Sequence, residues 1–348
     1  MTKLPLSRRL AAALLLVGLA DVGSAAPPRP FVPVYETDFP DPFIIEHKGE
    51  YLAYATNSGG TNLPMASSRD LITWTTVRDP DRPGKRLDAM PVLAPWVEAG
   101  RTWAPEVIKL GGRWLLYYTA RHKKRNTQCV GVAAAADPRG PFRDNSAEPL
   151  VCDYEGGGTI DAHPFHDTDG QLYLYHKSDS NSIRKPTTPI WGQRLSPDGM
   201  SVVGKPVSLL LNDRPWEAHV IESPTMVRTA RGYTMLFSAN HFGWEPHQRL
   251  SPYAMGYATC ATPLGPCTDA PENPILHSYN DRKAGCLSGP GHQAVFQARG
   301  RSYIAFHAWG ATAGCRTANK GRYMYIAPLS WTAAGKPVIA PSLRPKGK

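Results

Sequence analysis

A short strand signature that recurs five times is the feature of this sequence that most limits its fold. Each copy begins with a turn glycine and continues through a run of aromatic and β-branched residues. The copies read GEYLAYAT from Gly49, GRWLLYYTA from Gly112, GQLYLYHK from Gly170, GYTMLFSAN from Gly232 and GRSYIAFHAW from Gly300. Successive glycines are 63, 58, 62 and 68 residues apart, so the chain is built from five similar units.

Further short strands complete each unit. One apolar strand, such as PFIIEHK or PTMVRTA, precedes each glycine-led run, and two more follow around a polar turn. The turns of the second and fourth units match at Gly131, Pro138, Gly140 and Pro141 and at Gly256, Pro263, Gly265 and Pro266. Five units of four short strands predict an all-β fold, a five-bladed β-propeller that forms a single domain over residues 26–348. A pair of β-sandwiches is the alternative, but five equal units fit it poorly.

Residues 1–25 have the features of a secretory signal peptide. Lys3, Arg8 and Arg9 give a positive start, an apolar stretch too short for a stop-transfer span follows, and small residues lead up to Ala25. An uncleaved N-terminal anchor is the alternative. No later stretch is long and apolar enough to cross a membrane, so we expect a secreted or periplasmic protein without a membrane span.

The chain has a formal net charge of +10, but its Lys and Arg residues are scattered. The densest cluster, RHKKR at Arg121 to Arg125, is short and is typical of a solvated loop. The charge pattern therefore does not predict nucleic-acid binding.

Six cysteines in a chain with an export signal indicate disulfide bonds. No CxxC pair and no zinc-site spacing occurs. The sequence alone allows about 15 connectivities. We expect sequence neighbours to pair, as Cys129–Cys152, Cys260–Cys267 and Cys286–Cys315.

Acidic residues stand at the start of three units. Asp41 lies directly before a proline, Asp161 three residues before one and Glu222 two residues before one; the remaining units have Trp103 and His292 in this region. The first strand of each propeller blade lines the central channel, so three blades would each send one acid to the same end of it. Clustered carboxylates disfavour one another's ionisation, and such clustering therefore indicates a function.

Hydrolysis of a glycosidic bond is the chemistry that needs such carboxylates. One must stay protonated to donate to the leaving oxygen, and another must stay ionised to attack or to activate water. A third can raise the pKa of the acid. The trio indicates a glycoside hydrolase; a carbohydrate-binding propeller without turnover is the alternative from another functional class.

The motifs FPDPFII, RTWAPEV, TIDAHPFHDTDGQLYLY, IESPTMV and GPGHQAVF resemble, in this order, the blade-start motifs of glycoside hydrolase family 43. The resemblance implies that Asp41 is the general base that activates water, Glu222 the general acid and Asp161 the third carboxylate, which tunes and orients the acid. It also implies inversion at the anomeric carbon, with base and acid about 6.5–9.5 Å apart.

The same resemblance assigns three substrate-binding residues. Trp103 would offer an apolar wall to a sugar face, and a core tryptophan is the alternative. His292 matches the axial histidine of the family; no cofactor is required, but a structural metal ion near His292 stays an open alternative to a hydrogen-bonded histidine. Arg322 matches a late arginine that reaches a sugar hydroxyl, and Arg316 competes with it.

Other acids compete for catalytic roles. Asp38 is the rival of Asp41 but lies farther from the strand, and Glu106 lies inside its strand, where its side chain could point away from the channel. Glu155 and Glu217 are expected on the rim or in loops.

Substrates of the family are α-L-arabinofuranosides, arabinan and β-xylosides. The chain ends soon after the fifth unit, and the extra β-sandwich of many family β-xylosidases is not expected. This favours an exo-acting α-L-arabinofuranosidase on arabinan or arabinoxylan. The alternatives within the family are β-xylosidase and endo-arabinanase. We expect a monomer, with the segments Asn212–His219 and Asn240–Arg249 as walls of the substrate cleft.

Overall fold

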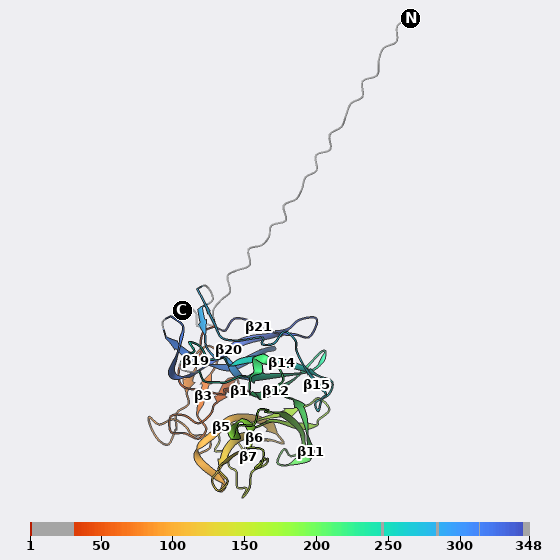
Figure 1. The fold of residues 1–348 in the computed structure, drawn as a ribbon. Coiled ribbons are helices and arrows are strands. Elements are labelled where there is room, and N and C mark those ends of the chain that lie inside the picture. The colour runs from red at the N-terminus through yellow and green to blue at the C-terminus, as the bar shows by residue number, and fades with distance from the viewer. Residues whose placement is uncertain (2–30, 245–246, 283–284, 313, 344–348) are drawn as a thin grey trace.

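The computed structural model describes residues 31–244, 247–282, 285–312 and 314–343, together with Met1, and these form an almost wholly β structure (Figure 1). Apart from Met1, the predicted signal peptide lies outside the described residues. Two short 3₁₀ helices, η1 (Ser180–Ile183) and η2 (Pro215–Glu217), interrupt the strands. Within the described part of the chain, no helix has the length and apolar character needed to cross a bilayer.

Five antiparallel sheets follow one another along the chain, and each is one blade of the predicted propeller. Blade I contains β1 (Phe43–His47), β2 (Glu50–Tyr54), β3 (Met65–Ser68) and β4 (Thr75–Thr76). Blade II contains β5 (Val97–Leu110), β6 (Arg113–His122) and β7 (Thr127–Ala135). Blade III contains β8 (Thr159–His166), β9 (Leu172–Ser178), β10 (Ile190–Leu195) and β11 (Val202–Leu210). Blade IV contains β12 (Ile221–Thr229), β13 (Gly232–Ala239), β14 (Ala254–Cys260) and β15 (Cys267–Asp269). Blade V contains β18 (Gly291–Ala298), β19 (Arg301–Thr312), β20 (Arg316–Trp331) and β21 (Pro337–Ile339), and a hairpin of β16 (Tyr279–Asp281) and β17 (Gly285–Leu287) precedes it.

Blade II departs from the expected four strands. The segment after β7 contributes only isolated bridges, Val130 with Val151 and Ala134 with Arg143, in place of a fourth strand. The matching Pro266 of blade IV is followed directly by β15, so this difference does not follow from the shared proline.

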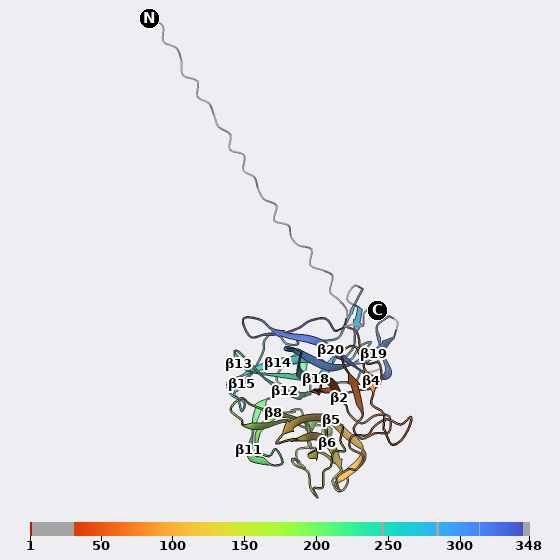
Figure 2. The same ribbon diagram turned by 180° about the vertical axis from the view of Figure 1, so that it is seen from behind.

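The first strands of the blades form a closed ring. β1 contacts β5 and β18, β8 contacts β5 and β12, and β12 contacts β18. Both ribbon views place β19 and β20 of the last blade beside the strands of blade I (Figures 1 and 2). The segment ahead of β1 joins them, because the N–H of Val34 donates to the carbonyl of Met324 and the N–H of Phe39 to that of Arg322.

The apolar core is divided among the interfaces between blades. Each of five buried clusters draws its members from two adjacent blades; one joins Tyr54 of blade I to Trp96 and Phe142 of blade II. Because both faces of a blade are covered, strands such as β6 are apolar almost throughout instead of alternating. A pair of β-sandwiches would have one core between the two sheets of each pair, so this division of the core confirms the propeller.

Tyrosine hydroxyls tie successive blades together. The hydroxyl of Tyr54 donates to the carbonyl of Pro138 at 2.7 Å, and that of Tyr175 donates to the carbonyl of Pro263 at 2.8 Å. These are the matched prolines of the second and fourth units, so the repeated turn presents the same acceptor to the blade before it. All three expected disulfides are confirmed: Cys129–Cys152, Cys260–Cys267 and Cys286–Cys315.

Replacing one of these tyrosines should weaken the ring measurably. Tyr175→Phe leaves the buried carbonyl of Pro263 without its donor, and we expect the free energy of unfolding to fall by about 1–2 kcal/mol. Urea denaturation followed by tryptophan fluorescence measures the change. Tyr303→Phe is the matched control, because this hydroxyl makes no hydrogen bond to any described residue; equal losses in both variants would contradict the assignment.

Candidate active site

A left-handed backbone conformation occurs once at the start of each blade, always at a residue other than glycine. The φ angles are 58° at Asp41, 45° at Ala104, 59° at Asp161, 54° at Ser223 and 51° at His292. In blades II to V the strand register shifts at the same place, so each of these first strands carries a bulge. The five residues therefore occupy equivalent positions around one end of the channel, where strained backbone aims their side chains.

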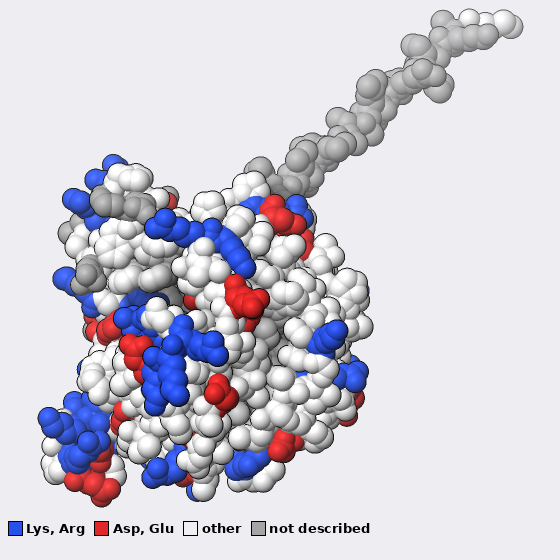
Figure 3. All heavy atoms as spheres, turned by 60° about the horizontal axis from the view of Figure 1, so that its bottom comes forward, with Lys and Arg blue, Asp and Glu red and all other residues white. Residues whose placement is uncertain are grey.

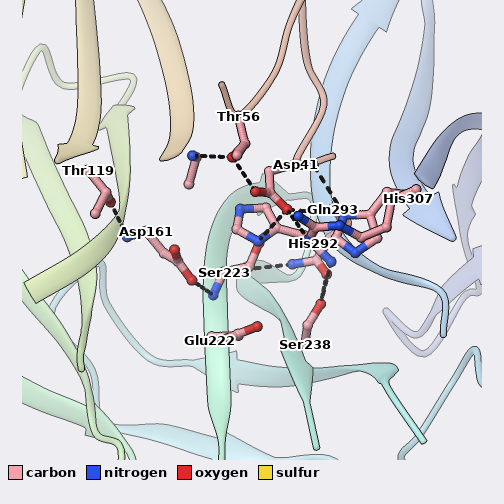
Figure 4. A network of polar contacts seen from close by, with 12 residues as sticks. Asp41, Thr56, Thr119, Asp161, Glu222, Ser223, Ser238, His292, Gln293 and His307 are labelled. Carbon is pink, nitrogen blue, oxygen red and sulfur yellow. Dashed lines mark hydrogen bonds and ion pairs between the residues drawn. The ribbon is translucent and has the colours of Figure 1, made fainter. Parts of the chain in front are cut away.

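A side chain from the preceding blade holds the backbone N–H at four of the five positions. The donor–acceptor pairs are Asp41 to His307 Nδ1 (3.1 Å), Ala104 to Thr56 Oγ1 (2.9 Å), Asp161 to Thr119 Oγ1 (3.0 Å) and His292 to Ser238 Oγ (2.8 Å). Blade III has Lys177 at this place, paired with Ile160 across the strands, and an ammonium group cannot accept a hydrogen bond. The N–H of Ser223 donates instead to Oδ2 of Asp161 at 3.0 Å. Figure 4 shows these contacts converging on the channel.

Glu222 departs from the expected equivalence of the three acids. Asp41 and Asp161 are equivalent, but Glu222 comes one residue before the left-handed Ser223 and pairs with Ser238. It thus corresponds to Trp103 of blade II, which pairs with Thr119. In the sequence the proline follows the acid at a different distance in each unit, and this concealed the one-residue offset of Glu222.

All six residues singled out in the sequence line one cavity of about 420 Å³. They are Asp41, Trp103, Asp161, Glu222, His292 and Arg322. The cavity opens at the end of the channel where the first strands begin, and it brings together side chains from all five blades.

Asp41 is surrounded by cationic groups. Its Oδ1 lies 3.2 Å from Nη1 of Arg322 and 3.4 Å from Nδ1 of His292, and Thr56 donates to its other oxygen. Burial by itself would raise the pKa of Asp41, but the charges of His292 and Arg322 outweigh it and hold this pKa well below its ordinary value of 3.8. The Asp41 carboxylate is therefore ionised throughout the physiological pH range.

Asp161 and Glu222 form a second, different carboxyl environment. Burial raises the pKa of Asp161 to about 7; His292 opposes this shift and the neighbouring Glu222 adds to it. Glu222 accepts a hydrogen bond from the hydroxyl of Tyr253 at 2.6 Å and lies 3.4 Å from Nζ of Lys177. Asp161 therefore retains its proton up to about pH 7.

The comparisons with known proteins agree with this geometry. The family model "Glycosyl hydrolases family 43" matches residues 31–337. The chain belongs to this family.

Family 43 relatives and solved structures cover most of the chain. The arabinoxylan arabinofuranohydrolase of Bacillus subtilis is 27% identical over 85% of this chain and 61% of its own length, and the extracellular endo-α-(1→5)-L-arabinanase 2 of the same organism is 26% identical over 78% and 65%. This chain thus spans less than two thirds of either relative. The crystal structure of a thermostable family-43 glycoside hydrolase superposes with a TM-score of 0.71 at 26% identity, covering 89% of this chain and 95% of that one.

A resident metal ion does not fit the site well. One ligand atom each from Asp161, Glu222 and His292 lie within 4.8 Å of one another, close enough to coordinate a cation. Both oxygens of Glu222, however, are already engaged by Tyr253 and Lys177. Burial would lower the pKa of His292, but the neighbouring carboxyl groups outweigh it and raise the pKa, which favours the protonated ring over the neutral ring that binds a metal. Membership of family 43 indicates no required cofactor.

The competing acids and Arg316 are absent from the residues that line the cavity. Asp38 accepts the backbone N–H of Arg322 at 2.9 Å and so positions that arginine. Glu106 is partly buried in β5 and its Oε2 lies 2.6 Å from Nδ1 of His163. Arg316 pairs with Thr312 at the far end of its hairpin. Glu217, expected on the rim or in a loop, lies in the connection between β11 and β12, where its side chain is buried and caps η2 by accepting the N–H of Arg214 at 2.8 Å.

The two expected cleft walls have different roles. Asn240, His241 and Phe242 line the cavity, and the guanidinium of Arg322 lies over the Phe242 ring at 5.3 Å. The segment Asn212–His219 contributes no lining residue; it packs behind this loop, where the carbonyl of Glu217 accepts the N–H of Asn240.

Sequence reasoning missed Lys177 and Tyr253, which touch Glu222. The Nζ of Lys177 is fully buried and also contacts Asn181 at 2.7 Å and Asp179 at 3.4 Å. A signal for Lys177 was present, since it stands seven residues after its turn glycine, where Thr56, Thr119 and His307 stand after theirs. No repeat marks Tyr253.

Removing the buried ammonium should destabilise the protein in a pH-dependent way. Lys177→Met leaves the carboxylates of Asp179 and Glu222 without a cation, and we expect a loss of about 3 kcal/mol at pH 7. The loss should shrink toward acidic pH, because burial raises the pKa of Asp179 and a protonated carboxyl needs no counter-ion. Urea unfolding at several pH values measures this; a pH-independent loss, or an equal one in the exposed-site control Lys205→Met, would contradict it.

Proposed function

We propose that the protein is an inverting glycoside hydrolase that removes terminal α-L-arabinofuranosyl groups from arabinan or from arabinose-substituted polysaccharide. The observation that carries the proposal is that one cavity holds an ionised carboxylate, Asp41, and a carboxyl that keeps its proton up to about pH 7, Asp161, which lies beside Glu222. Inverting hydrolysis needs one group of each kind.

Each carboxyl group has a defined part in the proposed reaction. Asp41 accepts a proton from a water molecule, which attacks the anomeric carbon from the face opposite the leaving group. Glu222 donates its proton to the glycosidic oxygen as the bond breaks. Asp161 tunes and orients this acid, and Arg322, His292 and Thr56 hold Asp41 in place.

Cavity size and the related proteins support the pentoside assignment. A cavity of about 420 Å³ is at the small end of the range of ligand sites and suits a terminal sugar between Trp103 and Phe242. An arabinoxylan arabinofuranohydrolase and a non-reducing end α-L-arabinofuranosidase of Bacteroides ovatus are among the relatives. An endo-arabinanase and a β-xylosidase are also among them, and they mark the alternative specificities.

The site of action proposed is outside the cytoplasm. The N-terminal charge and apolar pattern supports export, and three disulfide bonds fit an oxidising compartment. We propose that the protein acts there as a monomer on polysaccharide.

Replacement of the two reacting carboxyls should separate their roles. Asp41→Asn should lower kcat by about 10²–10⁴-fold on both 4-nitrophenyl α-L-arabinofuranoside and linear arabinan, because water loses its base. Glu222→Gln should lose more on arabinan than on the nitrophenyl glycoside, whose leaving group needs little protonation. Asp38→Asn is the control, since the amide oxygen still accepts the N–H of Arg322. Full activity in Asp41→Asn would refute the assignment, and release of oligosaccharides instead of arabinose would favour endo action.

The pH profile should report the carboxyl pair. We expect kcat/KM to fall as the pH rises through about 7, because Asp161, which lies beside the acid Glu222, then loses its proton. No matching acidic limb from Asp41 is expected above its ordinary pKa of 3.8, since its pKa lies well below this value. In Lys177→Met the alkaline limb should move to higher pH, because the ammonium that lowers the pKa of Asp161 is gone. An unchanged limb in this variant would argue against the pair as the acid.

A further inference from the structure

A second cavity of about 350 Å³ adjoins the catalytic one. Trp103 and Asp179 line both cavities, so they form the partition between them. The second cavity lies over blades II and III, where the β6–β7 turn faces the segment around Tyr154. A sugar chain that occupies the first cavity can therefore extend into the second along the Trp103 ring.

Cationic side chains dominate the second cavity. Arg101 and Arg121 line it, and the guanidinium of Arg125 lies over the Tyr154 ring at 5.1 Å. Arg121 is paired with Glu98 at 3.4 Å, but Arg101 has no carboxylate partner among the described residues. Figure 3 views the molecule from the side of blades II and III. On this face Lys and Arg gather in groups, with Asp and Glu between them. The RHKKR cluster, expected to be a solvated loop, thus borders a cavity.

The one acidic residue that lines this cavity does not offset its positive charge. Asp179 lies 3.4 Å from Nζ of Lys177, on the side of the catalytic cavity. Its charge is therefore already matched, and the two arginines leave the second cavity electropositive.

Gln128 gives an independent indication of a ligand. This residue of β7 lines the second cavity and is only 6% exposed, yet neither its amide nitrogen nor its amide oxygen has a hydrogen-bond partner in the described structure. Buried polar groups in proteins are nearly always paired, and an exception calls for an explanation. Both amide atoms are shielded from solvent, so a bound hydroxyl or carboxylate oxygen would accept from the amide nitrogen once the Gln128 side chain turns toward the cavity.

We infer that the second cavity is a subsite for a uronic acid residue of the polysaccharide. The guanidinium fork of Arg101 matches a carboxylate in shape and charge, and the Tyr154 ring offers a face to a sugar. The inference rests on the proposed function, and it narrows the substrate to a polysaccharide that carries uronic acid close to the arabinosyl group.

Binding to a catalytically disabled chain tests the subsite without turnover. Glu222→Gln is titrated calorimetrically with an arabinose-substituted xylo-oligosaccharide that carries a glucuronosyl branch, and with the same compound after reduction of its carboxyl group to an alcohol. We expect about fivefold tighter binding of the acid form at low salt, with the preference falling as salt screens the charges. A pectic fragment with galacturonosyl residues, in acid and reduced forms, identifies which uronate is preferred.

Variants assign the preference to this cavity. Arg101→Ala in the Glu222→Gln background should abolish the difference in affinity between the acid and reduced forms. Arg301→Ala is the control and should keep the difference, because Arg301 lies at the start of β19 in blade V and does not line this cavity. Equal affinity for acid and reduced forms of both fragments would overturn the inference, as would a preference that survives Arg101→Ala. Failure of the proposed function would be distinct, because wild-type protein would then release no arabinose from either fragment.

Discussion

The hydrogen bond between a left-handed backbone N–H and a side chain of the preceding blade sets the geometry of the cavity. Left-handed φ is costly for residues other than glycine, and it persists only where the surroundings hold it. Here Thr56, Thr119, Ser238 and His307 each hold the N–H of the next blade. Because the acceptor and the residue whose N–H it holds belong to different blades, the packing of one blade on the next also orients the functional side chains.

The exception in this pattern gives the site its asymmetry. Lys177 replaces the hydroxyl acceptor in blade III, so the Ser223 N–H turns to Asp161 and orients that carboxylate. The ammonium group of Lys177 lies 3.4 Å from the carboxylate of Glu222. Two carboxyl environments result within one cavity: Asp41 among His292 and Arg322, and Asp161 beside Glu222. Environments that drive pKa values apart in this way are how one site provides both an acid and a base.

Much of the fold could be predicted because the repeat is written in residues with strong local constraints. The turn glycines and the matched Pro138 and Pro263 fixed the unit length and the blade count. The fourth strand of blade II could not be predicted, since the loss of a continuous ladder depends on how the segment after Pro141 meets β7. The neighbour pairing of cysteines succeeded for Cys129–Cys152 and Cys260–Cys267 because consecutive segments of one blade lie side by side. Cys286–Cys315 instead joins the β16–β17 hairpin to the turn between β19 and β20.

The candidate site was predictable in its members but not in its register. A local motif placed Asp41, Asp161 and Glu222 at blade starts, yet only strand pairing reveals that Glu222 corresponds to Trp103. Lys177 and Tyr253 act through contacts between strands distant in sequence, and no single motif contains those contacts. The adjoining basic cavity was likewise invisible, because Arg101 and the turn at Arg121 come together only in the folded blade.

The ring closes where blade V meets blade I, and the catalytic cavity lies at this junction. Asp41 belongs to the first blade, while the side chains that keep it ionised, His292 and Arg322, belong to the last. In a chain whose last blade is not yet in place, Asp41 lacks the cations that set its charge state. The charge state of Asp41 therefore depends on closure of the whole ring, so an incomplete chain lacks the ionised carboxylate that the proposed reaction needs.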